Sequence, residues 1–300
     1  MSAFLTLLKR EWLESTLPFF WLPVGLFAFI FLIGMMGLAV WGFDGLHMMM
    51  TADNEAAEFI YIDNWTNQQL ADRLTALRTF IGAPFFMFYA AAAIFVLLGT
   101  LFDDRKDRSI LFWKSMPVSD YETVASKLVL AVWVAPLVAI AAAVITQIFF
   151  LTIISGYVLL QDLGSIGRLW WHSGIVTGTF QLVLGFLIQG FWTLPIWAWL
   201  LLISALVPRM PLFWAILIPL IPIATEAILF SSSAILSSIA RHLEAAAIPN
   251  VSGDDRIMPV ARTVGDQLAL LASVDLWLGV LAGAALLYGA VRLRGWKNEI

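Results

Sequence analysis

The stretch Asp103–Lys127, DDRKDRSILFWKSMPVSDYETVASK, lies between two long hydrophobic segments and decides how the rest of the chain is interpreted. It is charged near both ends, whereas its middle, SILFWKSM, is mostly apolar. The basic residues that precede the next hydrophobic segment are Arg105, Lys106, Arg108 and Lys114. Because loops rich in Lys and Arg stay on the cytoplasmic side of a membrane, this loop is expected there. Its apolar middle indicates a surface that docks on another molecule.

The composition places the chain in a membrane. It is 61% hydrophobic and 13% charged, with a mean hydropathy of +0.89, whereas soluble domains are about 25% charged. A helix needs about 20 apolar residues to cross a bilayer. The predicted spans are 18–41, 80–101, 128–154, 173–207, 212–230 and 274–291. We therefore predict an all-α integral membrane protein with six transmembrane helices, forming a single domain over residues 1–300.

The basic residues also predict the topology. Those at the ends of the six spans fall on one side of the membrane: Lys9, Arg10, Arg105, Lys106, Arg108, Lys114, Lys127, Arg209, Arg292, Arg294 and Lys297. Both termini and the loop 102–127 are then cytoplasmic. The opposite side holds two long loops, 42–79 and 231–273, in which acidic residues dilute the basic ones. Helical insertions are expected in these outer loops, at 67–77, 234–247 and 263–271.

Residues 2–16 have the pattern of an amphipathic helix at the membrane surface. The apolar positions Phe4, Leu5, Leu8 and Trp12 recur at helical spacing, and Lys9, Arg10 and Glu14 lie on the other side. Arg10 and Glu14 are also spaced for an i,i+4 ion pair. The alternative is that this segment is a solvated start to the first span.

Three local signals mark where helices end or begin. Pro117 ends the apolar middle of the charged loop, and Ser119 with Glu122 has the S-x-x-E spacing of a capping box at the start of the third span. Pro195 lies within the overlong segment 173–207 and is predicted to kink or divide it.

Four polar residues fall inside predicted spans and form a possible translocation path: Gln147, Gln181, Gln189 and Glu226. Glu226 is the acidic one, and a buried carboxylate in a span is costly, so it could be a gate, a proton site or a cation-binding group. Alternatively it lies near the outer interface and is hydrated or neutral. The glutamines could line the path or join helices by hydrogen bonds.

Signals for catalysis and for metal binding are weak. The chain has no cysteine, and its histidines, His47, His172 and His242, lie on separate loops without a close ligand pair. It contains no G-x-S-x-G and no G-x-x-x-x-G-K-[ST]. No catalytic residue, metal ligand or bound cofactor is therefore predicted. If the chain takes part in ATP-driven work, a separate polypeptide must bind the nucleotide.

The pattern RSILFWKSMPVS, followed eight residues later by Lys127, resembles the cytoplasmic loop of ABC-2 type transporter permeases. In that family a hydrophobic run is followed by Leu-Pro-Val-Ser and by a Lys that opens the next helix. The sequence Lys9-Arg10-Glu11 also resembles the family's entry helix. One departure is Asp107-Arg108-Ser109, where many members have Glu-Gly-Thr.

The resemblance implies a permease that pairs with a second copy or a paralogue and with cytosolic P-loop ATPase subunits, which would bind ATP and Mg. It implies a coupling helix at 109–115 that docks on the ATPase. The implied docking residues are Arg105, Arg108, Ser109, Ile110, Leu111, Phe112, Trp113 and Lys114. The basic members would meet acidic groups, and the apolar members would form the anchor. The implied location is a bacterial inner membrane.

Several functions stay open at this point. The leading one is the membrane subunit of an ATP-driven exporter. The alternatives are a mechanotransmission or assembly subunit that acts on envelope partners without transporting, an ion-coupled secondary transporter that uses Glu226, and a membrane enzyme. An accessory protein on the outer loops is a further candidate partner, whereas nothing in the sequence indicates nucleic acid.

Overall fold

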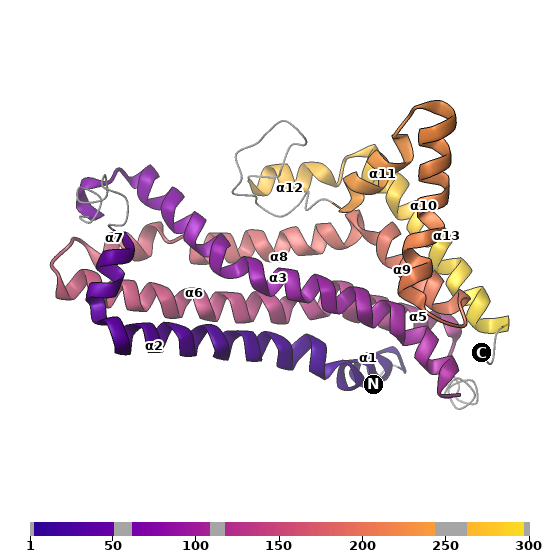
Figure 1. Ribbon diagram of the computed structural model, residues 1–300, viewed down its shortest axis with the longest axis horizontal. Helices are drawn as coiled ribbons and strands as arrows, with labels where there is room; N and C mark the ends of the chain where they lie inside the picture. Colours follow the sequence, from indigo (N-terminus) through magenta and orange to yellow (C-terminus); the bar gives the residue numbers. More distant parts are fainter. Residues whose placement is uncertain (1–2, 51–61, 109–117, 244–262, 297–300) are drawn as a thin grey trace. The chain divides into compact units, whose positions relative to one another are not determined.

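The computed structural model describes residues 3–50, 62–108, 118–243 and 263–296, and these are helical with short connections. Within those ranges, six helices are long and apolar enough to cross a membrane. The prediction of a helical chain is thereby confirmed, with six helices whose length and composition are compatible with a multi-pass membrane protein (Figure 1).

The helices of the first half are α1 (Ala3–Glu14), α2 (Leu22–Met50), α3 (Asn67–Lys106), α5 (Asp120–Val129), α6 (Ala135–Leu160) and α7 (Ile166–His172). Those of the second half are α8 (Ile175–Trp192), α9 (Leu194–Leu206), α10 (Pro211–Phe230), α11 (Ala234–Leu243), α12 (Val264–Leu270) and α13 (Val274–Trp296). One π-helical segment, η1 (Leu17–Trp21), precedes α2, and another, η4 (Leu130–Val134), joins α5 to α6. A short 3-10 turn, η3 (Ile62–Asn64), precedes α3.

Several helices extend well beyond the predicted apolar segments. α3 begins at Asn67 and continues to Lys106, so polar residues on both sides of the apolar segment are also helical. The predicted segment 173–207 is divided, as Pro195 indicated: α8 ends at Trp192, and Pro195 lies in the first turn of α9. A proline is tolerated there because the first turn of a helix needs no backbone donor. Two of the segments expected to be helical, 234–247 and 263–271, contain α11 and α12, although residues 244–247 lie outside the described ranges.

The chain divides into two compact units. Unit 1 comprises Met1–Leu17, Ala90–Pro136 and Leu184–Ile300, and unit 2 comprises Pro18–Tyr89 and Leu137–Val183. In unit 2, Phe85 of α3 packs with Ala142 and Ala143 of α6 against apolar side chains of α2. A second core joins the start of α3 to α7 and to the end of α6, where Leu70 is completely buried.

In unit 1, α13 packs along α9, and α1 packs against α5 (Figure 1). Gly283 makes the first of these contacts close, because a Cβ at this position would lie 2.8 Å from Leu194 Cγ and 3.2 Å from the Leu194 carbonyl carbon. Small residues allow the backbones of membrane helices to approach in this way. α11 is attached by the stacked rings of Trp192 and His242.

Two of the spanning helices are almost uncovered by protein. In Leu17–Val40, only 6% of an apolar stretch of 18 residues is buried inside the protein. The same share is buried in Pro211–Phe230. Soluble monomers rarely expose apolar surfaces of this extent to water. Lipid, or another membrane-embedded chain, is the environment that suits these two helices.

Candidate functional site: a buried charge cluster beside the predicted docking loop

The predicted docking loop connects α3 to α5. Residues 109–117 lie outside the described ranges, and with them most of the implied docking residues: Ser109, Ile110, Leu111, Phe112, Trp113 and Lys114. Arg108 is described, is exposed, and has a left-handed φ of 57°. The site can therefore be built from the two flanks of the loop, which are the last turns of α3 and the first turns of α5.

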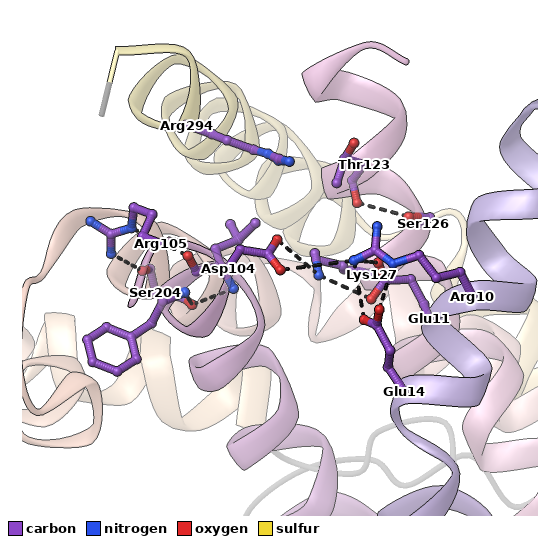
Figure 2. A network of polar contacts seen from close by, with 12 residues as sticks. Arg10, Glu11, Glu14, Asp104, Arg105, Thr123, Ser126, Lys127, Ser204 and Arg294 are labelled. Carbon is purple, nitrogen blue, oxygen red and sulfur yellow. Dashed lines mark hydrogen bonds and ion pairs between the residues drawn. The ribbon is translucent and has the colours of Figure 1, made fainter. Parts of the chain in front are cut away.

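Lys127 of α5 stands at the centre of the site (Figure 2). Its Nζ lies 3.1 Å from Glu11 Oε2 of α1 and 3.4 Å from Asp104 Oδ2 of α3. All three residues are buried, with 2%, 1% and 8% of their surfaces exposed, respectively. Removing charges from water is costly unless they are paired, so this arrangement requires all its members. One ammonium group thus joins three helices.

Arg10 extends the arrangement along α1. Its Nη2 lies 3.3 Å from Glu11 Oε1 and 4.0 Å from Asp104 Oδ1. Its Nε donates to Glu14 Oε1 at 2.7 Å, so the predicted i,i+4 pair is confirmed. We call Arg10, Glu11, Asp104 and Lys127 the charge cluster. Its two cations and two anions compensate each other inside the protein.

Burial affects the pKa of one member of the cluster, Glu11. It raises the pKa of Glu11, and the attraction of Lys127 and Arg10 offsets this only in part. The carboxylate therefore remains costly even in the presence of its partners, as expected where desolvation exceeds the Coulombic gain. The consequence is a contact that depends on exact pairing, so losing any one member leaves a charge without compensation.

The end of α3 is also held by Arg105. Its Nη2 donates to the carbonyl oxygens of Ser204 at 2.6 Å and of Val207 at 2.9 Å, at the end of α9. Ser204 Oγ in turn accepts from the backbone N–H groups of Leu101 and Phe102. Arg105 is 3% exposed. The sequence grouped Arg105 with the docking residues, but the structure places its guanidinium inside unit 1, because α3 continues past its apolar segment and meets α9.

The start of α5 is held from two directions. Ser119 Oγ accepts from the backbone N–H of Glu122, and the Glu122 carboxylate accepts from the backbone N–H of Ser119, so the predicted capping box is confirmed. Asp120 Oδ1 lies 3.3 Å from Arg294 Nε of α13. The negative charge of Asp120 also suits the positive end of α5. The loop therefore leaves and enters helices whose ends are fixed to α1, α9 and α13.

The four residues of the possible translocation path are divided between the units. Gln147 of unit 2 is buried, and its Nε2 donates to the carbonyl oxygen of Arg78 at 2.9 Å. Gln181 of the same unit is partly buried. Gln189 of unit 1 is buried in α8, and its backbone carbonyl oxygen accepts from the hydroxyl of Thr193. Each residue is thus described within its own unit.

Glu226, the fourth of these residues, caps a helix. Its Oε1 accepts from Ser232 Oγ at 2.7 Å and from the backbone N–H of Ala234 at 2.8 Å. Its Oε2 accepts from the backbone N–H of Ile235 at 2.8 Å. These amides open α11, where the backbone needs acceptors from outside the helix. The sequence did not reveal this role, because it depends on a left-handed turn at Ser231 that returns the chain towards α10.

The described residues contain no group of three His, Cys, Asp or Glu side chains that could hold a metal ion. Because its charges pair with one another across α1, α3 and α5, the charge cluster can hold these three helices in position. Comparison of the chain with protein-family models, with curated proteins and with solved structures finds no match in any of the three.

Proposed function

We propose that the chain is the membrane-spanning subunit of an ATP-driven transporter of the ABC-2 type, acting as an exporter. A separate cytosolic P-loop ATPase binds ATP and Mg and docks on the loop 102–127. A second copy of the chain, or a paralogue, completes the membrane part. In this proposal the chain lies in a bacterial inner membrane with both termini in the cytoplasm.

The observation that carries the proposal is the way both flanks of the loop are fixed. Asp104 on one flank and Lys127 on the other meet at 3.4 Å, and Glu11 joins them from α1. Asp120 adds a link to Arg294 of α13. Because a buried charge that loses its partner is strongly penalised, a displacement of the loop that keeps these pairs intact would move the helices together. This is the property that a docking loop needs if it is to transmit a movement to the spans.

The contact with the ATPase is assigned to the middle of the loop. Its sequence supplies an apolar anchor at Ile110–Trp113, with Arg108 and Lys114 beside it. Aromatic anchors within a polar rim are the usual composition of a binding hot spot. Since Arg105 is bound to backbone carbonyls of unit 1, Arg108 and Lys114 are the basic residues to which we assign the contact with acidic groups of the partner.

The experiment is purification of the tagged chain from its native membranes in mild detergent, with mass spectrometry of the subunits that co-elute and an ATP hydrolysis assay. We expect a P-loop ATPase at near-equal stoichiometry. Trp113→Ala should abolish this association without changing membrane insertion. The matched control is Trp171→Ala, which changes a tryptophan that is 85% exposed and distant in sequence from the loop.

Two results would count against the proposal. One is a preparation without any P-loop ATPase, obtained in a detergent that preserves other complexes of this kind. The other is an ATPase that remains bound to Trp113→Ala as firmly as to Trp171→Ala, because the anchor would then lie elsewhere.

A further inference from the structure

α11, the helix that follows α10 in unit 1, is amphipathic, and none of its 10 residues is buried. Its apolar face is formed by Ile235, Leu236, Ile239 and Leu243, and its polar face by Ser237 and Arg241. Leu236 is 49% exposed and Leu243 is 60% exposed. A helix on the surface of a soluble domain turns its apolar face to the core. The open apolar face of α11 therefore needs surroundings of another kind.

The start of α11 is fixed to α10 at a defined height. α10 ends at Phe230. Glu226, four residues earlier, accepts hydrogen bonds from the backbone N–H groups of Ala234 and Ile235, both at 2.8 Å. Because a helix rises about 1.5 Å per residue, this attachment lies about 6 Å back from the end of α10. The chain thus reverses after α10 and begins α11 beside the last turns of that helix.

The end of α11 is fixed to α13 at a similar height. A Cβ at Gly279 would lie 2.5 Å from His242 Nε2, so the imidazole ring lies directly on the backbone of α13. The same ring stacks on Trp192, with 5.6 Å between the ring centres. α13 begins at Val274, so the contact at Gly279 lies about 8 Å inside this helix. Both attachments of α11 are thus level with parts of α10 and α13 that lie inside their ends (Figure 1).

The neighbouring ends of α10 and α13 expose apolar surface. These are two of the helices that are long and apolar enough to cross a membrane. At the end of α10, Ile228 is 78% exposed and Phe230 is 74% exposed. In the first turn of α13, Trp277 is 56% exposed, and its Nε1 donates to the carbonyl oxygen of Leu271 at 2.8 Å. A tryptophan with an apolar body and a bonded N–H is typical of the boundary between acyl chains and head groups.

The polar face of α11 is also open. Arg241 Nη1 lies 3.6 Å from Asp275 Oδ2, and 42% and 54% of the two side chains are exposed, respectively. An amphipathic helix in a membrane interface keeps its polar face in water and inserts its apolar face about 5–10 Å into the boundary of head groups and acyl chains. The two attachment heights of α11 fall within this range.

We propose that α11 lies in the interface of the membrane leaflet opposite the docking loop, with Ile235, Leu236 and Leu243 inserted among the acyl chains of the lipids. The two attachments, at Glu226 and at Gly279, set the depth of the helix. The proposal requires that α10 and α13 cross a membrane but requires no ATPase, so it stands or falls independently of the proposed transport function.

The test uses nitroxide labels on single cysteines, which the chain permits because it has no cysteine of its own. The labelled protein is reconstituted in vesicles of phosphatidylethanolamine and phosphatidylglycerol. Electron paramagnetic resonance then measures collisions of the label with oxygen, which concentrates in lipid, and with a nickel chelate, which stays in water. Leu236→Cys and Leu243→Cys report on the apolar face. The controls are Ser237→Cys, on the exposed polar face, and Leu220→Cys, which is 52% exposed near the middle of α10.

We expect the ratio of oxygen to nickel collisions at Leu236→Cys and Leu243→Cys to approach that at Leu220→Cys and to exceed that at Ser237→Cys several-fold. If one of the two variants does not fold, the other gives the same readout. Nickel collisions as frequent as at Ser237→Cys would overturn the insertion, because the apolar face would then lie in water. A label that neither reagent reaches would also overturn it, because protein, such as a second copy of the chain, would then cover the face.

Discussion

Lys127 Nζ lies 3.1 Å from Glu11 Oε2, although 116 residues separate the two along the chain. Both side chains are buried, and the same ammonium group lies 3.4 Å from Asp104 Oδ2. A helix near the N-terminus is therefore fixed to both flanks of the loop that we assign to ATPase docking. This relationship makes α1 a part of the coupling apparatus in our proposal.

Lys127→Ala should strongly destabilise unit 1. The substitution leaves Glu11 and Asp104 buried without the cation that lies between them. We expect a loss of about 3–5 kcal/mol in the free energy of unfolding, as for other buried pairs that lose one partner. Thermal unfolding in detergent measures it. The control is Lys106→Ala, which removes an exposed lysine from the neighbouring loop flank and should change stability by about 0.5 kcal/mol or less.

A double-mutant cycle separates pairing from packing. Glu11→Gln and Lys127→Met each remove one charge, and the double variant removes both. If the pair is coupled as its distance indicates, the double variant should be less destabilised than the sum of the two single variants. Simple additivity would contradict the pairing.

The stability of the chain should also depend on pH through Glu11. Burial raises the pKa of Glu11, so the folded chain holds this proton more tightly than the unfolded chain does. The free energy of unfolding therefore falls as the pH rises from the ordinary Glu value of about 4.3 through the raised pKa. Glu11→Gln removes this contribution. Comparison of the two chains between about pH 4 and about pH 7 should show the unaltered chain losing stability relative to Glu11→Gln. A constant difference would contradict an ionising, buried Glu11.

Gly283→Ala tests the close contact between α13 and α9. The added Cβ would approach Leu194 Cγ at 2.8 Å and the Leu194 carbonyl carbon at 3.2 Å, so the helices must move apart. We expect a loss of about 1–3 kcal/mol, typical of overpacking. At Gly25 of α2 a Cβ meets nothing within 4 Å, and Gly25→Ala should instead be neutral or stabilising by up to about 1 kcal/mol. Equal effects at the two positions would mean that Gly283 is not required for this packing.

Glu226→Ala should loosen α11 specifically. The substitution removes the acceptors of the backbone N–H groups of Ala234 and Ile235. Loss of such a cap costs about 0.5–2 kcal/mol, so amide hydrogen exchange in α11 should become faster while exchange in α13 stays the same. Asp72→Ala, at an exposed carboxylate of α3, is the control. Unchanged exchange in α11 would leave Glu226 without a capping role and would favour a function in ion coupling.

Local sequence patterns predicted the features that depend on neighbours along the chain. The apolar segments identified six helices that are long and apolar enough to cross a membrane, Ser119 and Glu122 identified the start of α5, and Pro195 identified the break between α8 and α9. In each case a few adjacent residues carry the physical cause, whether it is hydrophobic length, a capping pair or a missing backbone donor.

The charge cluster could not be predicted in this way, because Glu11, Asp104 and Lys127 come from three separate segments. Lys127 was placed at the end of the loop as the Lys that opens the next helix in the resembling family, and nothing in a linear pattern shows which acid it meets. Arg105 was placed with the docking residues by the same resemblance, and its guanidinium donates to carbonyl groups at the end of α9. The cap formed by Glu226 likewise depends on the turn at Ser231, which returns the chain towards α10.

The most direct test of the central claim is photo-crosslinking from Phe112 in native membranes. A photoreactive amino acid replaces Phe112 in one variant and, as a control, the exposed Phe230 at the end of α10 in another. The account predicts that irradiation joins position 112, and not position 230, to a P-loop ATPase identified by mass spectrometry. Absence of an ATPase adduct at position 112, with ATPase present in the same membranes, would contradict the docking role of the loop.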